Sequence, residues 1–181
     1  MFVGEPNHDT LRQGDLCSVP FFPIWQLPDT TTTTSAEQKI TSVNLPALKR
    51  VIPADSGFLA CVCTQCCDIE NNKGRVGITI APVRPAPLAY HDGGARERLA
   101  TSGEPKADGT FEWFHVFPLE LPQADGSSDL VVVDWSAIIS IGPHDQAIAK
   151  LRATKSHELL PVTRAHFRTK LAASFGRPDE D

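Results

Sequence analysis

The sequence predicts a mainly β fold, a small and strongly bent sheet or barrel, followed by C-terminal helices. Short segments rich in strand-forming residues recur along the first 142 residues, and Gly, Pro, Asn and Asp, which favour turns, separate them. Helical periodicity appears only after residue 143. Strands that precede helices in this way are typical of a sheet packed by terminal helices.

Six segments are predicted to be strands. Leu16–Val19 is followed by Pro20, which cannot donate to a strand ladder and should end that strand. Residues 58–66 and 76–83 flank a turn at 70–74 whose Asn and Gly residues tolerate a left-handed backbone, so these two segments should form a hairpin. The remaining predicted strands are residues 111–117, 130–135 and 137–141.

The segments between the strands define the domain organisation. A threonine-rich stretch at residues 28–46 and a Gly- and Pro-rich stretch at 84–110 are predicted to be loop insertions. They interrupt a β-barrel core that spans residues 10–142, and residues 143–177 form the predicted helical segment. A chain of 181 residues is expected to form a single domain.

The C-terminal segment is strongly basic, although the chain carries a net charge of -5. Asp145 is the expected cap of its first helix, and Thr163 that of its second. On the second helix, Arg164 and Arg168 lie four residues apart, a like-charge pair that favours an anion between them. Candidate residues for binding an anion or a partner are Arg164, Arg168 and Lys170, with RNA or an acidic protein as the partner. The alternative is that they pair with acidic residues of the body.

The composition indicates neither a secreted protein nor a membrane protein. The start, Met1-Phe-Val-Gly-Glu-Pro, has neither the basic stretch nor the apolar core of a signal peptide. No apolar run approaches the roughly 20 residues that span a membrane. Five cysteines, an odd number, cannot form a complete set of disulfides. We therefore expect a cytoplasmic protein with reduced thiols and no membrane contact.

Four of the five cysteines lie in one segment, Ala60-Cys-Val-Cys-Thr-Gln-Cys-Cys-Asp-Ile-Glu70. On a strand, Cys61 and Cys63 point to the same face with parallel Cβ vectors, a geometry that does not suit a disulfide. We expect both to be small core residues. Polar side chains at the end of this strand should gather at the rim of the barrel, where ligand groups bind. The candidate rim site comprises Gln65, Cys67, Asp68 and Arg84.

The motif Cys63-Thr-Gln-Cys66 leaves a thiol or zinc site open as an alternative. Its spacing fits half of a tetrahedral zinc site, but the sequence has no second ligand pair, so neither a metal nor another cofactor is predicted. A redox-active or nucleophilic thiol needs a nearby cation or a helix N-terminus, whereas Asp68 and Glu70 disfavour the thiolate.

The order of these signals resembles the MazF/PemK toxin family. The resemblance spans residues 12–175 and implies an SH3-like, PemK-type barrel that cleaves RNA. It rests on Gly14-Asp15 before the first strand and Pro20, Cys67-Asp68 after an apolar strand, Ile80-Ala-Pro-Val83, Leu130-Val-Val-Val-Asp134 with Ile138 and Ile141, and a closing helix.

Two catalytic positions of that family differ in this sequence. The family opens its second strand with Arg-Pro, whose arginine stabilises the charged phosphorane-like state, and Ser56-Gly57 stands at this place. The family's threonine after the third strand falls near Arg84. The resemblance therefore implies a bacterial toxin-like or defence-type protein that binds RNA or a protein partner without the family's catalytic pair. The alternative is a non-enzymatic interaction module that docks through its basic C-terminal helix.

Overall fold

The computed structural model describes residues 1–20, 22–25, 48–51, 58–70, 77–87 and 93–176. The predicted insertion at 28–46 lies outside these residues. The elements in chain order are β1 (Leu16–Val19), β2 (Phe22–Trp25), β3 (Leu48–Val51), β4 (Phe58–Val62), α1 (Cys66–Glu70), β5 (Ile78–Pro85), α2 (Gly93–Thr101), β6 (Val116–Pro122), β7 (Ser128–Asp134), a 3-10 turn (Trp135–Ala137), β8 (Ile139–Ile141), α3 (His144–Ala153), β9 (Lys155–His157) and α4 (Pro161–Phe175).

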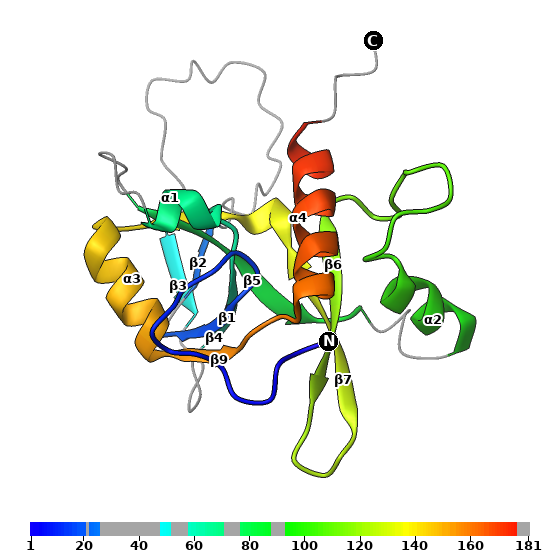
Figure 1. The fold of residues 1–181 in the computed structure, drawn as a ribbon, viewed down its shortest axis with the longest axis horizontal. Coiled ribbons are helices and arrows are strands. Elements are labelled where there is room, and N and C mark those ends of the chain that lie inside the picture. The colour runs from blue at the N-terminus through cyan, green and yellow to red at the C-terminus, as the bar shows by residue number, and fades with distance from the viewer. Residues whose placement is uncertain (21, 26–47, 52–57, 71–76, 88–92, 177–181) are drawn as a thin grey trace, which may run out of the picture.

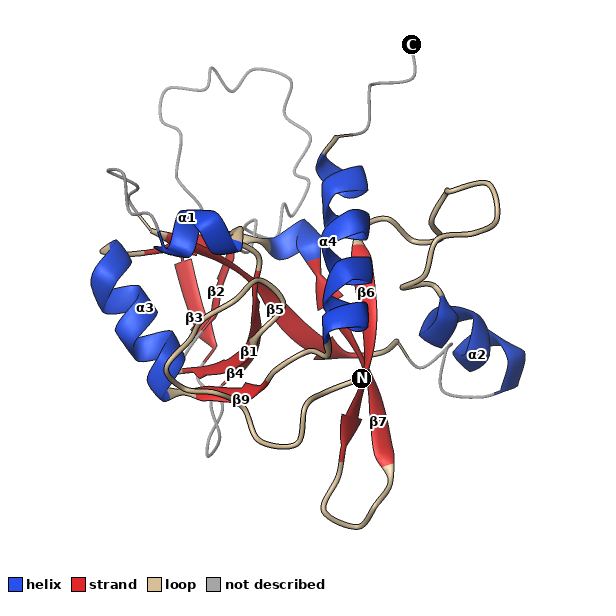
Figure 2. Ribbon diagram, viewed as in Figure 1, coloured by secondary structure: helices blue, strands red, loops and turns tan. Residues whose placement is uncertain are grey.

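Seven strands form one antiparallel sheet, which confirms the prediction of a mainly β fold with C-terminal helices (Figure 2). The strand order is β6-β7-β5-β4-β1-β9, and β8 also pairs with β5. β2 and β3 pair with each other in a second, two-stranded sheet. The large sheet is open, with β6 and β9 at its edges, so closure into a barrel is not seen in the part of the chain that the structure describes.

β5 pairs with three other strands of the large sheet and changes its partner along one edge. Along one edge it pairs with β4, and along the other edge it pairs first with β8 and then with β7. Gly77 immediately precedes β5, and a Cβ at this position would overlap the carbonyl group of Ile141 in β8. Glycine therefore allows the close approach of β5 and β8 at this end of their pairing.

Side chains alternate between two core clusters on opposite faces of the sheet. One cluster lies under α4 and contains Leu16, Cys61, Cys63, Ala81, Val133, Phe167 and Leu171. The other lies under α3 and contains Cys17, Ala60, Val62, Ile78, Ile80, Ala147 and Leu151. α3 and α4 therefore cover different faces of the sheet (Figure 1). The predicted burial of Cys61 and Cys63 is confirmed, since they are 0% and 8% exposed.

The prediction that residues 84–110 form a loop insertion is wrong in part. β5 continues to Pro85, and residues 93–101 form α2. Leu99 of α2 is buried with Leu130 and Val132 of β7 in a third, smaller cluster. Only one residue of α2 is buried, so the helix has too little apolar periodicity to be recognised in the sequence.

The strand predicted at 58–66 ends earlier, at Val62. The hydroxyl oxygen of Thr64 accepts the N–H of Thr79 at 2.7 Å, in the place of a backbone ladder bond. The chain then turns into α1, where the carbonyl oxygen of Gln65 accepts the N–H groups of Asp68 and Ile69. Cys66 and Cys67 consequently lie on a short helix and not on a strand.

Two further boundaries differ from the prediction. The strand expected at 111–117 begins at Val116 and runs to Pro122. The segment 143–177 is not purely helical, because β9 lies between α3 and α4 and pairs with β1.

Neither C-terminal helix has the predicted side-chain cap. α3 begins at His144 after Pro143, and α4 begins at Pro161, two residues before Thr163. A proline at the first helical position needs no cap for its missing N–H and fixes the backbone angle that the helix requires. None of the described helices is long and apolar enough to cross a membrane.

Candidate functional site

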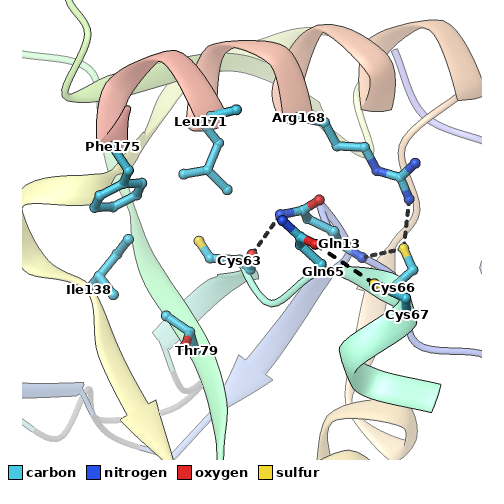
Figure 3. Close-up of a pocket in the computed structure, with 11 residues that line it drawn as sticks. Gln13, Cys63, Gln65, Cys66, Cys67, Thr79, Ile138, Arg168, Leu171 and Phe175 are labelled. Atoms are coloured by element: carbon cyan, nitrogen blue, oxygen red, sulfur yellow. Dashed lines mark hydrogen bonds between the residues drawn. The ribbon is translucent and has the colours of Figure 1, made fainter. Parts of the chain in front are cut away.

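A pocket of about 780 Å³ lies between the second half of α4 and the turn that joins β4 to α1 (Figure 3). It combines an apolar wall with a polar end, and three of its lining residues are cysteines. The lining residues are Gln13, Cys63, Gln65, Cys66, Cys67, Thr79, Ile138, Arg168, Leu171, Ala172 and Phe175.

The apolar and polar parts of the pocket are separated. Ile138, Leu171 and Phe175 lie at one end, and Arg168 and Cys66 lie at the other (Figure 3). Phe175 is 65% exposed, a large apolar side chain left at the edge of the pocket. An arrangement of this kind suits a ligand with an apolar body and a polar group at one end.

Cys66 is the centre of the polar end. Its Sγ accepts a hydrogen bond from Nη2 of Arg168 at 2.7 Å and a second from the backbone N–H of Gln13 at 3.4 Å. The side chain of Gln13 is held in turn, because its Nε2 donates to the carbonyl oxygen of Cys63 at 2.6 Å. These two donors fix the position of the Cys66 sulfur at the polar end of the pocket.

A tight turn brings Gln13 to this position. Gly14 has φ +92°, which glycine adopts without strain, and a Cβ there would lie 2.7 Å from Cδ1 of Leu159. The N–H of Gly14 donates to the carbonyl oxygen of Val62, and the N–H of Val62 donates to that of Asp15. The turn is therefore fixed to the end of β4, directly before the segment that carries Cys66.

The other cysteines are in different environments. Burial raises the pKa of Cys17 and of Cys63 to about 12 and raises that of Cys61 well above its ordinary value. These three thiols stay protonated near neutral pH. Cys67 is exposed and donates to Oε1 of Gln65 at 3.7 Å. Among the described contacts, Cys66 is the cysteine that has a cation at hydrogen-bond distance.

Arg168 is exposed on α4, and within the described residues no carboxylate forms an ion pair with it. It is the one member of the predicted basic set, Arg164, Arg168 and Lys170, that can meet a ligand from solution. Its guanidinium carries five N–H donors, and only one described bond, to Cys66, uses them.

The prediction that Arg164 binds an external partner is corrected by its burial. Arg164 is 6% exposed, and its Nη2 donates to Asp15 at 3.2 Å and to Glu158 at 3.3 Å. Lys155, 3% exposed, also bonds to both carboxylates. Arg164 thus follows the alternative hypothesis, in which the basic segment pairs with acidic residues of the body.

Lys170 is also buried and requires the same correction. It is 0% exposed, donates to the carbonyl oxygen of Ser102 at 2.6 Å, and lies 5.8 Å from the ring centre of Phe111. Burial lowers the pKa of Lys170 to about 8, with a smaller opposing effect from Glu112. Its ammonium group joins α4 to the segment after α2 and is not available to an anion in solution.

The predicted rim set is divided between two places. Gln65 and Cys67 line the pocket, whereas Asp68 and Arg84 are not among its lining residues. Arg84 lies in β5 and forms an ion pair with Asp134 at 3.4 Å. The set therefore does not form one site. Its members are separated because β4 ends at Val62, while β5 continues past Arg84 along β7.

The prediction missed Gln13, and it treated Cys66 only as part of a C-x-x-C motif. Cys66 and Arg168 are 102 residues apart, and no local pattern relates them. Within the described residues, no group of three or more His, Cys, Asp or Glu side chains is arranged to hold a metal ion.

Comparison of the chain with protein-family models, with curated proteins and with solved structures finds no match. The class of protein defined by the fold and the site is thus a mainly β protein with a thiol-containing pocket under its C-terminal helix.

Proposed function

We propose that the protein acts through Cys66, which is a reactive thiol in a pocket for a small ligand. The observation that carries this proposal is the hydrogen bond from Nη2 of Arg168 to Sγ of Cys66. The thiolate is the nucleophilic form of cysteine, and a nearby arginine stabilises it. The Cys63-Thr-Gln-Cys66 motif contains no cation, and Arg168 of α4 supplies one.

The pocket supports reaction with an electrophilic ligand that has an apolar body. The apolar body would contact Leu171 and Phe175, and the electrophilic atom would lie beside Cys66. The thiolate would form a bond to that atom and displace its leaving group, while the thiol proton passes to solvent. Before the reaction, Arg168 would donate a hydrogen bond to the sulfur of Cys66. Its other N–H donors would bind an anionic group of the ligand.

The first prediction concerns the rate at which Cys66 is alkylated. With iodoacetamide at pH 7, an S–C bond forms and iodide leaves. Arg168→Gln should slow this alkylation about three- to tenfold, the loss of one exposed charge-assisted contact. Arg168→Lys should retain part of the rate, because the charge remains. The measurement is the rate of label uptake at Cys66 by peptide mass spectrometry.

Lys150→Gln is the matched control for that experiment. Lys150 is an exposed cation on α3, outside the pocket, so its loss changes the net charge equally and should leave the rate at Cys66 unchanged. Equal rates in Arg168→Gln and in the unmodified protein would show that Arg168 does not activate the thiol, and the proposal would be rejected.

The second candidate is the toxin-like protein that binds RNA, as the MazF/PemK resemblance implies. The observation that favours it is the exposure of Arg168 without a carboxylate partner in the described part of the chain. For this candidate, binding of single-stranded RNA should weaken linearly with the logarithm of salt concentration, and Arg168→Ala should reduce the slope by about 0.7.

A titration with single-stranded RNA at low salt separates the two candidates. No binding at low salt would remove the RNA hypothesis and leave an acidic protein as the alternative partner of Arg168. Binding that is unchanged in Arg168→Ala would place the RNA contact elsewhere and remove the observation that favours this candidate.

A further inference from the structure

A second pocket, of about 460 Å³, adjoins Cys66 and Arg168, which line both pockets. It lies near the first half of α4 and has three arginines in its wall. Its lining residues are Val3, Arg12, Cys66, Glu158, Leu159, Pro161, Arg164, Ala165 and Arg168. Glu158 is the one carboxylate among them, so positive charge dominates this pocket.

The buried residues next to these arginines do not neutralise the positive charge of the pocket. Asp15 is fully buried beside Lys155, which adds one carboxylate and one cation to the cluster. The cluster then has four cations and two carboxylates among the described residues, a net charge of +2 when all are ionised. Burial raises the pKa of Asp15, and this effect exceeds the opposing effects of the Arg12 N–H and of the neighbouring cations.

The hydrogen bonding is also incomplete. Nη2 of Arg164 donates to Asp15, Glu158 and the carbonyl oxygen of Leu159, but its Nη1 is buried without a partner among the described residues. A buried guanidinium nitrogen without an acceptor is costly. Arg12 forms one long ion pair with Glu158 at 3.7 Å and is half-exposed, so most of its donors also remain available.

We propose that this second pocket binds a phosphate-type oxyanion, held by the exposed guanidinium groups of Arg12 and Arg168, with the buried Arg164 adding positive charge to the pocket wall. Arginine forks match the oxygens of a phosphate group and bind them with charge-assisted hydrogen bonds. The volume exceeds that of a single oxyanion, which leaves room for a group attached to it. The second pocket shares Cys66 and Arg168 with the first, so this inference extends the proposed function, whereas Arg12 and Arg164 line the second pocket and not the first.

Titration calorimetry of the full chain with inorganic phosphate and with phenyl phosphate tests the proposal. Arg12→Gln and Arg168→Gln should each weaken phosphate binding about three- to tenfold, since each removes a charge-assisted contact. Arg98→Gln, which removes an exposed arginine of α2 outside this pocket, should leave the affinity unchanged. Tighter binding of phenyl phosphate than of inorganic phosphate would assign the site to a phosphate monoester, and the reverse to the free ion.

The proposal is overturned if phosphate does not bind, or if sodium chloride at matched ionic strength abolishes the binding. It is also overturned if Arg98→Gln weakens binding as much as Arg12→Gln, because general charge would then account for it. Arg12 is not one of the described hydrogen-bond donors to Cys66, so the alkylation rate in Arg12→Gln should stay that of the unmodified protein. The two proposals can therefore fail separately.

Discussion

Near pH 10 the free energy of unfolding is expected to fall by about 3 kcal/mol for each unit of pH. Three buried thiols cause this fall. Cys17, Cys61 and Cys63 have pKa values raised by burial, to about 12 for Cys17 and Cys63, from an ordinary value of 9.0. Above pH 9 these thiols lose their protons in the unfolded chain and keep them in the folded protein, so rising pH favours unfolding.

Lys170 has the opposite effect in an adjacent range of pH. Burial lowers its pKa from 10.5 to about 8, so between these values the unfolded chain binds the additional proton and stability rises with pH. Near pH 10, the proton that the unfolded chain gains at Lys170 offsets the proton that it loses at one of the three thiols. The folded protein therefore binds two protons more than the unfolded chain, and this difference sets the slope of the free energy of unfolding against pH. Stability should be highest between pH 8 and 9, where the two effects cancel.

Urea unfolding at a series of pH values measures this slope. Cys17→Ala should roughly halve it near pH 10, because the net difference falls from two protons to one. Val62→Ala is the matched control: it also shortens a buried side chain in the same core cluster, but it should lower stability equally at every pH. A free energy of unfolding that stays constant up to pH 10.5 would contradict the burial of the three thiols.

Asp15→Asn is expected to destabilise the protein by about 3–5 kcal/mol. Asp15 is fully buried, and its two carboxylate oxygens accept bonds from Lys155 and Arg164. Without the charge of Asp15, Lys155 and Arg164 remain buried with Glu158 as their one carboxylate partner among the described residues. The loss is a large part of the stability of a typical domain, so the variant should unfold at a much lower urea concentration.

A double variant tests the cause of that loss. Lys155→Met removes one of the two buried cations, so Asp15→Asn combined with Lys155→Met should be more stable than the sum of the single effects predicts. Additive effects, or a cost of Asp15→Asn below about 1 kcal/mol, would contradict the role of the buried ion pairs.

Strand alternation allowed the position of Cys61 and Cys63 to be predicted. Alternation is a local property of a strand, and both residues lie in the core cluster under α4 as expected. The end of the strand was not predictable in the same way. It depends on Thr64 accepting the N–H of Thr79, a contact between segments that are 15 residues apart.

The candidate site was predicted in its parts but not as a whole. Two members of the predicted rim set, Gln65 and Cys67, line the pocket, and Arg168 was one of the three candidate residues for binding an anion or a partner. The contact between Arg168 and Cys66 depends on how α4 packs on the sheet through Phe167, which no local pattern specifies.

The roles of the three basic residues of α4 also depend on tertiary packing. Arg164 and Arg168 are neighbours on the helix, yet Arg164 is buried with Asp15 and Arg168 is exposed. The buried carboxylate belongs to the turn before β1, 149 residues away in sequence. The clustering of basic residues therefore identified α4 as the helix that carries a candidate binding residue, but it did not show which of its basic residues is exposed.

Competitive labelling of the native protein tests the central claim most directly. With less than one equivalent of iodoacetamide per chain at pH 7, the position of the label is read by peptide mass spectrometry. We expect Cys66 to carry most of it, ahead of Cys67, although Cys67 is the more exposed of these neighbouring thiols. Cys17, Cys61 and Cys63 should react only after unfolding. Labelling of Cys67 at the same rate as Cys66, or faster, would contradict the account, because exposure alone would then decide reactivity and Arg168 would have no effect.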